Sequence, residues 1–254
     1  MKDKYAIRKK IELLSIIIPV YNEIKTIELS ISNLYSVLKS ISTNFEVFVV
    51  ESNSNDGSRE KVLELQEKYK YNLTLQDSPK GKGSAVREAF YKISGEVFLI
   101  FDGDNEYDPK DLVKLIVPIE EGETSFVLGS RHSNLWKLRN FNNSKVISFI
   151  MNGAHIIFVN MINLFFSANL TDPFSMYKII RTDIFKDIRL TSNRFDLDWE
   201  LICISLRLGS KPIELPITYS SRSFKEGKKI KLFLDPITWM IALFKFRFLP
   251  IQKI

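Results

Sequence analysis

The stretch Val97–Pro109, VFLIFDGDNEYDP, decides the fold of this 254-residue chain. It opens with an apolar, β-favouring run that is typical of a short buried strand. Asp102 and Asp104 follow, separated by the small Gly103 in a turn where both carboxylates can converge on one cation. Carboxylate oxygens suit Mg²⁺ or Mn²⁺, which leave coordination positions open for phosphate oxygens. The stretch therefore predicts a strand that delivers a metal-binding acid pair to a cleft, with a solvated acidic turn as the alternative.

Strand and helix patterns alternate along the rest of the chain. We expect strands at Leu13–Val20, Phe45–Val50, Leu73–Gln76, Val97–Phe101, Thr124–Leu128 and Ile213–Tyr219, with a return to the sheet within Leu170–Ile179. We expect helices at 24–38 and Ser58–Lys70, within 80–93, and at Val146–Phe166 and Phe195–Leu208. This alternation predicts an α/β fold with a mostly parallel, Rossmann-like central sheet and helices on both faces.

Unusual polar groups follow three of these strands. The first strand ends at Pro19–Glu23, the second at Glu51, and Val97–Phe101 at Asp102 and Asp104. Ligands of open parallel sheets bind in the crevice beyond the carboxyl ends of the strands. We therefore expect these residues to meet at one binding edge.

The bulk composition is that of a soluble domain with a basic balance. Hydrophobic residues make up 45% and charged residues 26%, and the formal net charge is +6. This charge favours acidic ligands or an anionic membrane surface, and we find no motif for binding nucleic acid. Cys203 is the single cysteine; it cannot form an internal disulfide, so the chain fits a reducing, cytoplasmic compartment.

The composition of the tail from Lys225 onward differs from that of the rest of the chain, because basic residues precede and interrupt large apolar ones. The pattern is made by Lys225, Lys228, Lys229, Lys231, Lys245 and Arg247 with Trp239, Met240, Ile241, Leu243, Phe244, Phe246 and Phe248. It is typical of an interfacial helix on an anionic bilayer, and no run approaches the roughly 20 apolar residues of a membrane span. We expect a catalytic domain at 1–231 and an amphipathic, membrane-associated segment at 232–254. A helix packed on the domain is the alternative.

Eight motifs occur in an order that resembles glycosyltransferase family 2. Seven of them are SIIIPVYNE (15–23), ESNSNDGS (51–58), KGKGSAVREAF (80–90), FDGDNEYDP (101–109), GSRH (129–132), LTDPFSMYK (170–178) and FDLDWEL (195–201). The eighth, YSSRSFKEGKKI (219–230), is similar to the distal motif of the dolichyl- or polyprenyl-phosphate sugar synthases in that family. The resemblance covers residues 13–231 and implies a GT-A fold whose first half binds a nucleoside diphosphate sugar.

The resemblance also implies roles for residues on the donor side. The donor would be bound by Pro19, Tyr21, Glu23, Glu51, Lys82, Asp102, Gly103, Asp104, Arg222 and Lys228, with Asp102 and Asp104 holding the Mg²⁺ or Mn²⁺. The family usually has two successive aspartates where this chain has Glu51 and Ser52. That departure leaves GDP-mannose and UDP-glucose both open as donors.

On the acceptor side, the resemblance implies that Arg131 faces the phosphate of a polyprenyl phosphate. Lys145 and His132 are further candidates for contacts with that phosphate. Asp104, Arg131 and Arg222 are candidate catalytic residues, joined by Asp198 and Glu200 because an acid in this neighbourhood serves as base in relatives that use a hydroxyl acceptor. Because the two histidines and the cysteine are far apart in the sequence, a zinc site is not expected.

A lipid phosphate would need no general base, because its second pKa is about 6 and it therefore carries an anionic oxygen at neutral pH. We expect one in-line displacement that inverts the anomeric carbon, at a cytoplasmic membrane face. The first alternative keeps the donor half and transfers the sugar to a hydroxyl of a glycan. The second is a catalytically silent nucleotide-sugar-binding scaffold.

Overall fold

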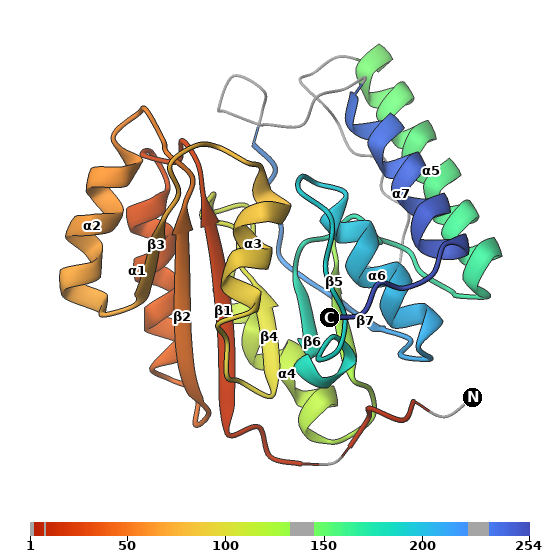
Figure 1. Cartoon of the computed structure of the whole chain (residues 1–254), viewed down its shortest axis with the longest axis horizontal. Helices are drawn as coiled ribbons and strands as arrows, with labels where there is room; N and C mark the ends of the chain where they lie inside the picture. Colours follow the sequence, from red (N-terminus) through yellow and green to blue (C-terminus); the bar gives the residue numbers. More distant parts are fainter. Residues whose placement is uncertain (1–2, 8, 133–144, 223–233) are drawn as a thin grey trace.

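The computed structural model describes residues 3–7, 9–132, 145–222 and 234–254. Figure 1 shows a central sheet with strand order β3-β2-β1-β4-β6-β5-β7. Its strands are β1 Leu13–Val20, β2 Asn44–Glu51, β3 Asn72–Leu75, β4 Val97–Ile100, β5 Phe126–Ser130, β6 Lys178–Arg181 and β7 Ile213–Pro216. The helices are α1 Ile27–Leu38, α2 Ser58–Tyr69, α3 Lys82–Phe90, α4 Leu112–Glu120, α5 Lys145–Phe166, α6 Leu197–Arg207 and α7 Leu234–Phe248, with short turns η1 Pro109–Asp111 and η2 Thr182–Ile184.

The sheet is mostly parallel, as expected. β1 pairs in parallel with β2 and β4, β2 with β3, and β5 with β7, whereas β6 runs antiparallel to both β4 and β5. The chain moves outward from β1 through β2 to β3 and then returns to β4 on the other side of β1. Because such crossovers are right-handed, the reversal places α3 on the opposite face of the sheet from α1 and α2 (Figure 1).

Strand register fixes the edge at which the candidate residues gather. Ile17 of β1 is paired with Ile100 of β4, and Val20 with Glu51 of β2. The carboxyl ends of the three central strands therefore lie side by side, and their loops share one edge. The strands behind that edge are almost fully buried and form one apolar core with the helices.

Helices α5, α6 and α7 pack against one another on the side of the molecule that holds β6, β5 and β7 (Figure 1). Trp239, Leu243 and Phe246 bury one face of α7 against its neighbours, while Ile241 and Phe248 are each 61% exposed on the other. Within the described residues, no helix has both the length and the apolar character that crossing a bilayer requires. The proposed boundary at residue 231 stays a prediction because it falls outside the described ranges.

Gly95, just before β4, tests how closely the first and fourth strands must approach. A Cβ at this position would lie 2.5 Å from Ser15 Oγ and 2.7 Å from the Leu13 carbonyl oxygen, so β1 would have to shift. We expect Gly95→Ala to lower the free energy of unfolding by about 1–3 kcal/mol in chemical denaturation. The matched control is Gly153→Ala on α5, where nothing lies within 4 Å of the added methyl group. A Gly95→Ala protein as stable as the control would contradict this packing.

Candidate active site

A cavity of about 770 Å³ opens at the carboxyl ends of the central strands. Ten of the residues singled out from the sequence line it: Pro19, Tyr21, Glu23, Lys82, Asp102, Gly103, Asp104, Arg131, Asp198 and Arg222. Glu51, His132 and Glu200 lie outside its lining. The side chain of Lys145 and all of Lys228 fall outside the described residues. The cavity has the size of small-ligand sites, and the binding edge expected from the strand ends is therefore present.

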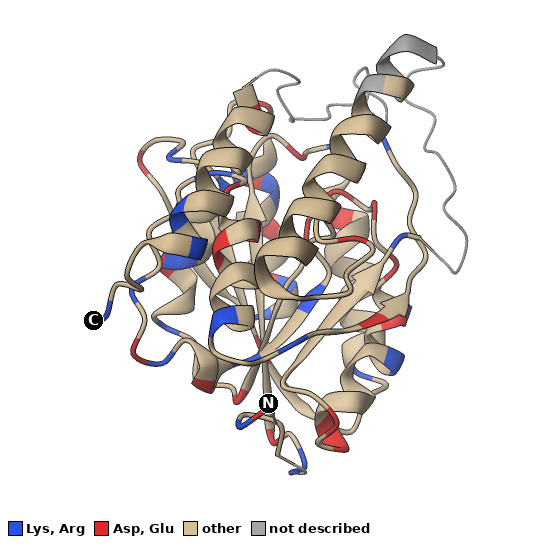
Figure 2. Cartoon of the chain, turned by 90° about the vertical axis from the view of Figure 1, so that its right-hand side faces the viewer, with Lys and Arg blue, Asp and Glu red and all other residues tan. Residues whose placement is uncertain are grey.

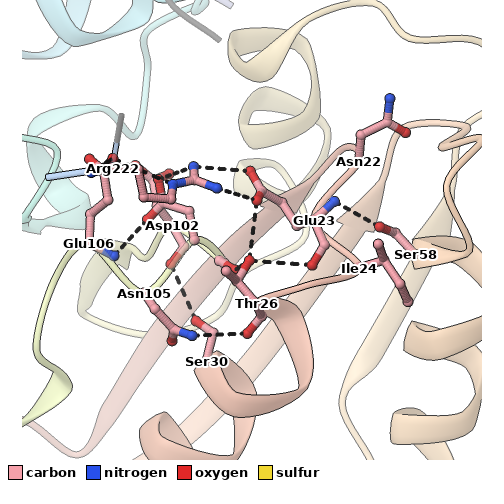
Figure 3. A network of polar contacts seen from close by, with 12 residues as sticks. Asn22, Glu23, Ile24, Thr26, Ser30, Ser58, Asp102, Asn105, Glu106 and Arg222 are labelled. Carbon is pink, nitrogen blue, oxygen red and sulfur yellow. Dashed lines mark hydrogen bonds and ion pairs between the residues drawn. The ribbon is translucent and has the colours of Figure 1, made fainter. Parts of the chain in front are cut away.

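The centre of the cavity is a cluster of carboxylates gathered around Arg222. The guanidinium group donates to Asp104 Oδ2 at 2.7 Å and to Glu23 Oε2 at 2.8 Å, and its Nε lies 3.5 Å from Glu106 Oε1 (Figure 3). Asp102 lies beside this cluster and pairs with Lys82 Nζ at 2.5 Å. Lys82 and Arg222 thus contact four acids that come from two segments of the chain, the loop after β1 and the acid turn after β4.

The charges in this cluster are not fully compensated. Burial raises the pKa of Asp104, and the negative charges of Asp102 and Glu106 raise it further; Arg222 offsets only part of this, and the pKa reaches about 7. A carboxylate that resists ionisation beside two others is an environment that favours an added cation. Carboxylate oxygens are the ligands that Mg²⁺ and Mn²⁺ prefer, so the metal site expected at this turn stays a prediction.

Glu106 is the member of this cluster that sequence reasoning missed. It accepts hydrogen bonds from Tyr219 Oη at 2.5 Å and from the Arg222 backbone amide at 2.9 Å, so it also ties the returning segment 219–222 to the acid turn. The available signal was its spacing, because Asp102, Asp104 and Glu106 alternate along one short turn.

The turn that carries the acids is held by α1. Thr26 Oγ1 donates to the Gly103 carbonyl oxygen at 2.9 Å, and Asn105 Nδ2 donates to the Thr26 carbonyl oxygen at 3.2 Å (Figure 3). A Cβ on Gly103 would lie 2.7 Å from Ile27 Cδ1. A larger residue between Asp102 and Asp104 would therefore make the Ile27 side chain move.

Lys82 enters the site from the N-terminal turn of α3. Burial lowers the pKa of its ammonium group, but the charges of Asp102 and Asp198 more than offset this, so the pKa lies above its ordinary value. Lys82 is therefore a permanent cation on the cavity wall, next to the amide groups of a helix N-terminus that also favour an anion.

Arg131 directly follows β5 and lines the same cavity. Its Nε and Nη2 donate to the two oxygens of Asp172 at 2.7 and 2.6 Å, and its guanidinium carbon lies 5.0 Å from the centre of the Tyr219 ring. This two-point ion pair fixes the plane of the guanidinium group. Arg131 is consequently a pre-oriented cation, reached from the cavity.

The fold brings the two histidines together although they are distant in sequence. The ring centres of His132 and His155 lie 4.9 Å apart, and each ring can offer an atom within 4.8 Å of an Asp172 oxygen. Sequence distance was therefore a poor argument against a metal here. However, both Asp172 oxygens already accept hydrogen bonds from Arg131, so a metal would compete with that ion pair.

Asp198 and Glu200 leave the first turn of α6 in different directions. Asp198 lines the cavity and accepts from the buried Lys178 Nζ at 2.9 Å, a partner that sequence reasoning missed. Burial raises the pKa of Asp198 and the charges of Lys178 and Lys82 lower it, with a net shift upward. Glu200 instead accepts backbone hydrogen bonds from Thr191 and Ser192, behind the cavity wall.

Residues 15–189, which carry the first six of the eight motifs, match a family model described as glycosyl transferase family 2. The chain belongs to glycosyl transferase family 2. It is a glycosyltransferase by family membership, and the resemblance seen in its sequence motifs is confirmed. The family match includes the acid turn, Lys82 and Arg131, which line the cavity, and Asp172, which orients Arg131.

Relatives and solved structures agree with this assignment. The dolichol-phosphate mannosyltransferase of Pyrococcus furiosus is 31% identical over 214 residues, which is 84% of this chain but only 58% of that protein. The dolichyl-phosphate beta-glucosyltransferase of Saccharomyces cerevisiae is 27% identical over 243 residues, 88% of this chain and 71% of the relative. The crystal structure of glucosyl-3-phosphoglycerate synthase from Mycobacterium tuberculosis superimposes with a TM-score of 0.68 at 17% identity, covering 94% of this chain and 82% of that one. This likeness confirms the GT-A fold.

Glu51 is fully buried in this glycosyltransferase, and its carboxylate accepts hydrogen bonds from the loop that follows β2. It accepts from the Ser54 amide at 2.6 Å, the Asn53 amide at 3.2 Å and Arg59 Nε at 2.5 Å. Burial raises its pKa, but these hydrogen bonds and the Arg59 charge outweigh burial, so the pKa lies below its ordinary value of 4.5. Its contact with a nucleotide base stays a prediction, and its measurable role is to order the loop after β2.

The lowered pKa of Glu51 predicts a pH-dependent contribution to stability. Because the folded pKa is the lower one, the stabilisation is present above about pH 4.5 and is lost as the pH falls below it. We expect Glu51→Gln to cost about 2 kcal/mol of unfolding free energy at pH 7 and distinctly less at pH 3, measured by chemical denaturation. Glu64→Gln, which removes an exposed partner of Lys61, is the control and should cost little at either pH. A constant penalty for Glu51→Gln across this range would contradict the assignment.

Proposed function

We propose that this glycosyltransferase moves a hexose from a nucleoside diphosphate sugar to the phosphate of a polyprenyl phosphate. One observation carries the proposal: the same cavity is lined by the acid cluster with Lys82 and Arg222 and by the oriented Arg131. Two anionic groups, a diphosphate and a phosphate, fit a cavity with these three cations. The names of the P. furiosus and S. cerevisiae relatives support a dolichyl phosphate acceptor.

The donor diphosphate would lie against the acid turn. Asp102, Asp104 and Glu106 would hold a divalent cation, and when bound it would supply Lewis-acid stabilisation of charge on the diphosphate. Lys82 and the amide groups that open α3 provide fixed positive charge on the same wall. A protein with this fold has been solved with Mn²⁺ and UDP-glucose, so the fold accommodates ligands of this class.

The acceptor phosphate would lie against Arg131. Because Asp172 holds the guanidinium group in place, little reorganisation is needed when an anion arrives. An anionic phosphate oxygen then attacks the anomeric carbon, and the bond from that carbon to the diphosphate oxygen breaks with its electron pair leaving on the nucleotide. No proton has to move at neutral pH, and the single displacement inverts the anomeric carbon.

The proposal allows either guanine or uracil as the base of the donor nucleotide. Tyr21 and Ser52 line the cavity next to the end of β2, and Ser52 Oγ donates to Gln76 Oε1 at 2.9 Å. Since Glu51 is held by Arg59, the base would meet Ser52 before it meets a carboxylate. GDP-mannose and UDP-glucose are both retained as donors.

The lipid substrate requires a membrane surface, and α5 and α7 provide a suitable face. Figure 2 shows α5 without charged residues after Lys145, its first residue, and α7 with its Lys and Arg residues near one end. Exposed apolar side chains gather on both helices: Phe149, Ile156, Ile157, Leu164, Ile237, Ile241, Phe244 and Phe248. We propose that this face lies on the cytoplasmic surface of a bilayer and brings the cavity to its acceptor.

A hydroxyl acceptor is the second candidate, and Asp198 is the observation that favours it. It lines the cavity with a pKa shifted upward, which are the properties of a general base. A glycan product stays in water, whereas a lipid-linked sugar partitions into organic solvent. Extraction of the labelled product therefore separates the two functions.

The acid cluster yields the first test. With GDP-mannose or UDP-glucose, Mg²⁺ or Mn²⁺ and a short polyprenyl phosphate, we expect organic-extractable label that depends on the metal. Asp104→Asn should lower the rate at least about a hundredfold, because it removes a negative charge from the metal cluster. Asp187→Asn, an exposed acid away from the cavity, is the matched control. Water-soluble labelled product would favour the hydroxyl acceptor, and absence of donor binding would favour the silent scaffold.

The membrane face yields the second test. We expect the paired change Ile241→Ser and Phe248→Ser on α7 to weaken co-sedimentation with vesicles of anionic phospholipid several-fold, because exposed apolar area is lost. Leu29→Ser on α1, where the side chain is 58% exposed, serves as a control of equal exposure on another face. Equal loss of binding in both proteins, or in neither, would contradict a membrane role for this face.

A further inference from the structure

The loop 191–194 forms part of the cavity wall and leans on the start of α3. The Asn193 carbonyl oxygen accepts from the Ser84 amide at 3.1 Å, and Arg87 donates to the Ser192 carbonyl oxygen at 3.0 Å and to Asn193 Oδ1 at 2.8 Å. The approach is so close that a Cβ on Gly83 would lie 2.7 Å from the Ser192 carbonyl oxygen. The loop therefore determines where the first turn of α3 can lie.

Glu200 holds this loop from behind. One carboxylate oxygen accepts from the Thr191 amide at 2.7 Å and Thr191 Oγ1 at 2.9 Å, and the other accepts from the Ser192 amide at 2.8 Å. Asp196, one helical turn earlier, accepts from the Arg194 amide at 2.8 Å. Glu200 is 1% exposed and absent from the cavity lining, so it acts on substrates only through the loop.

The first turn of α3 is the part of the donor site that the loop supports. Gly81 and Lys82 line the cavity, and Lys82 pairs with Asp102 of the acid turn. A displacement of the loop would release the turn that carries Lys82 and its neighbouring amides. On the acceptor side, Arg131 is oriented by Asp172 and receives no contact from this loop among the described interactions.

Helix α7 grips the same loop at two points. Lys245 Nζ donates to Thr191 Oγ1 at 2.9 Å, and Arg194 Nη2 lies 3.4 Å from Asp235 Oδ1. Thr191 is thus held between Glu200 on one side and α7 on the other. The loop is fixed by helices on its outer side and in turn fixes α3 on its inner side.

We propose that Glu200 is a positioning residue for the donor: it presses the loop 191–194 against α3 and so sets Lys82 and the Gly81–Gly83 backbone at the diphosphate. This inference rests on the proposed function, because it presumes a nucleoside diphosphate sugar in that part of the cavity. It assigns Glu200 a role separate from proton transfer. The expected signature is a change in donor affinity with acceptor affinity unchanged.

The test is the substitution Glu200→Gln in the full chain. A glutamine keeps the size of the side chain, but its amide nitrogen is a donor. It must face either Thr191 or Ser192, which also donate at this site, so at least one hydrogen bond to the loop is lost. We expect the dissociation constant for the donor, measured by calorimetry with Mn²⁺ and whichever of GDP-mannose or UDP-glucose the wild type binds, to rise about tenfold. The KM for polyprenyl phosphate and the pH profile of kcat should stay unchanged.

Glu96→Gln is the matched control, because one Glu96 oxygen accepts two backbone amides, from Glu12 and Leu13, at the other end of the sheet. It should leave donor binding unchanged. If Glu200→Gln binds donor like the wild type, or loses only kcat together with the acidic limb of its pH profile, as loss of a general base would cause, the positioning role is wrong. If the wild type itself binds neither donor, the proposed function fails instead.

Gly83→Ala pushes on the loop from its inner side and gives an independent check. We expect it to weaken donor binding by a similar factor, and the double variant with Glu200→Gln to be no weaker than either single one, since both break the same contact. Fully additive losses would show that the two residues act separately and would overturn the proposal. Thermal unfolding of each variant distinguishes a loss of fold from a loss of donor binding.

Discussion

The charge balance around Arg222 is the constraint on which the rest of the site depends. Glu23, Asp104 and Glu106 come from the loops after β1 and β4, and they converge on one guanidinium group from a segment more than one hundred residues later. Burial and the neighbouring carboxylates both raise the pKa of Asp104, and the charge of Arg222 offsets part of this. The loops after β1 and β4 are therefore held together by Arg222, which comes from a much later part of the chain.

The sheet makes this convergence possible. Because β1, β2 and β4 are parallel and in register, their carboxyl ends present three loops at one level. β6 is inserted antiparallel between β4 and β5, so β5 and its Arg131 stand two strands away from the acid turn. Arg131 is nevertheless linked to the acid turn, because its guanidinium group lies over the Tyr219 ring and Tyr219 Oη donates to Glu106.

The sequence was sufficient for the fold because its strands are apolar runs with polar ends. Leu13–Val20 was predicted to its exact bounds, and the expected helices at Ser58–Lys70 and Val146–Phe166 match α2 and α5 within a residue. It was also sufficient for the acid turn, whose residues are adjacent in the chain. It could not reveal Lys178 beneath Asp198, because that contact joins β6 to α6 and follows no local pattern. Nor could the sequence show that Arg59 forms a salt bridge with Glu51. Each residue, considered separately, fits a solvated loop.

The spacing of Asp196 and Glu200 shows what a local rule can and cannot deliver. Helical periodicity places the two on one face and Asp198 on another, and the structure confirms this division. Periodicity does not say which face meets the substrate. Only the folded structure shows that Asp196 and Glu200 accept hydrogen bonds from backbone amides, whereas Asp198 lines the cavity. An acid in a family motif can therefore act by shaping the wall of a site, and its burial behind that wall, rather than its presence in the motif, is what separates the two roles.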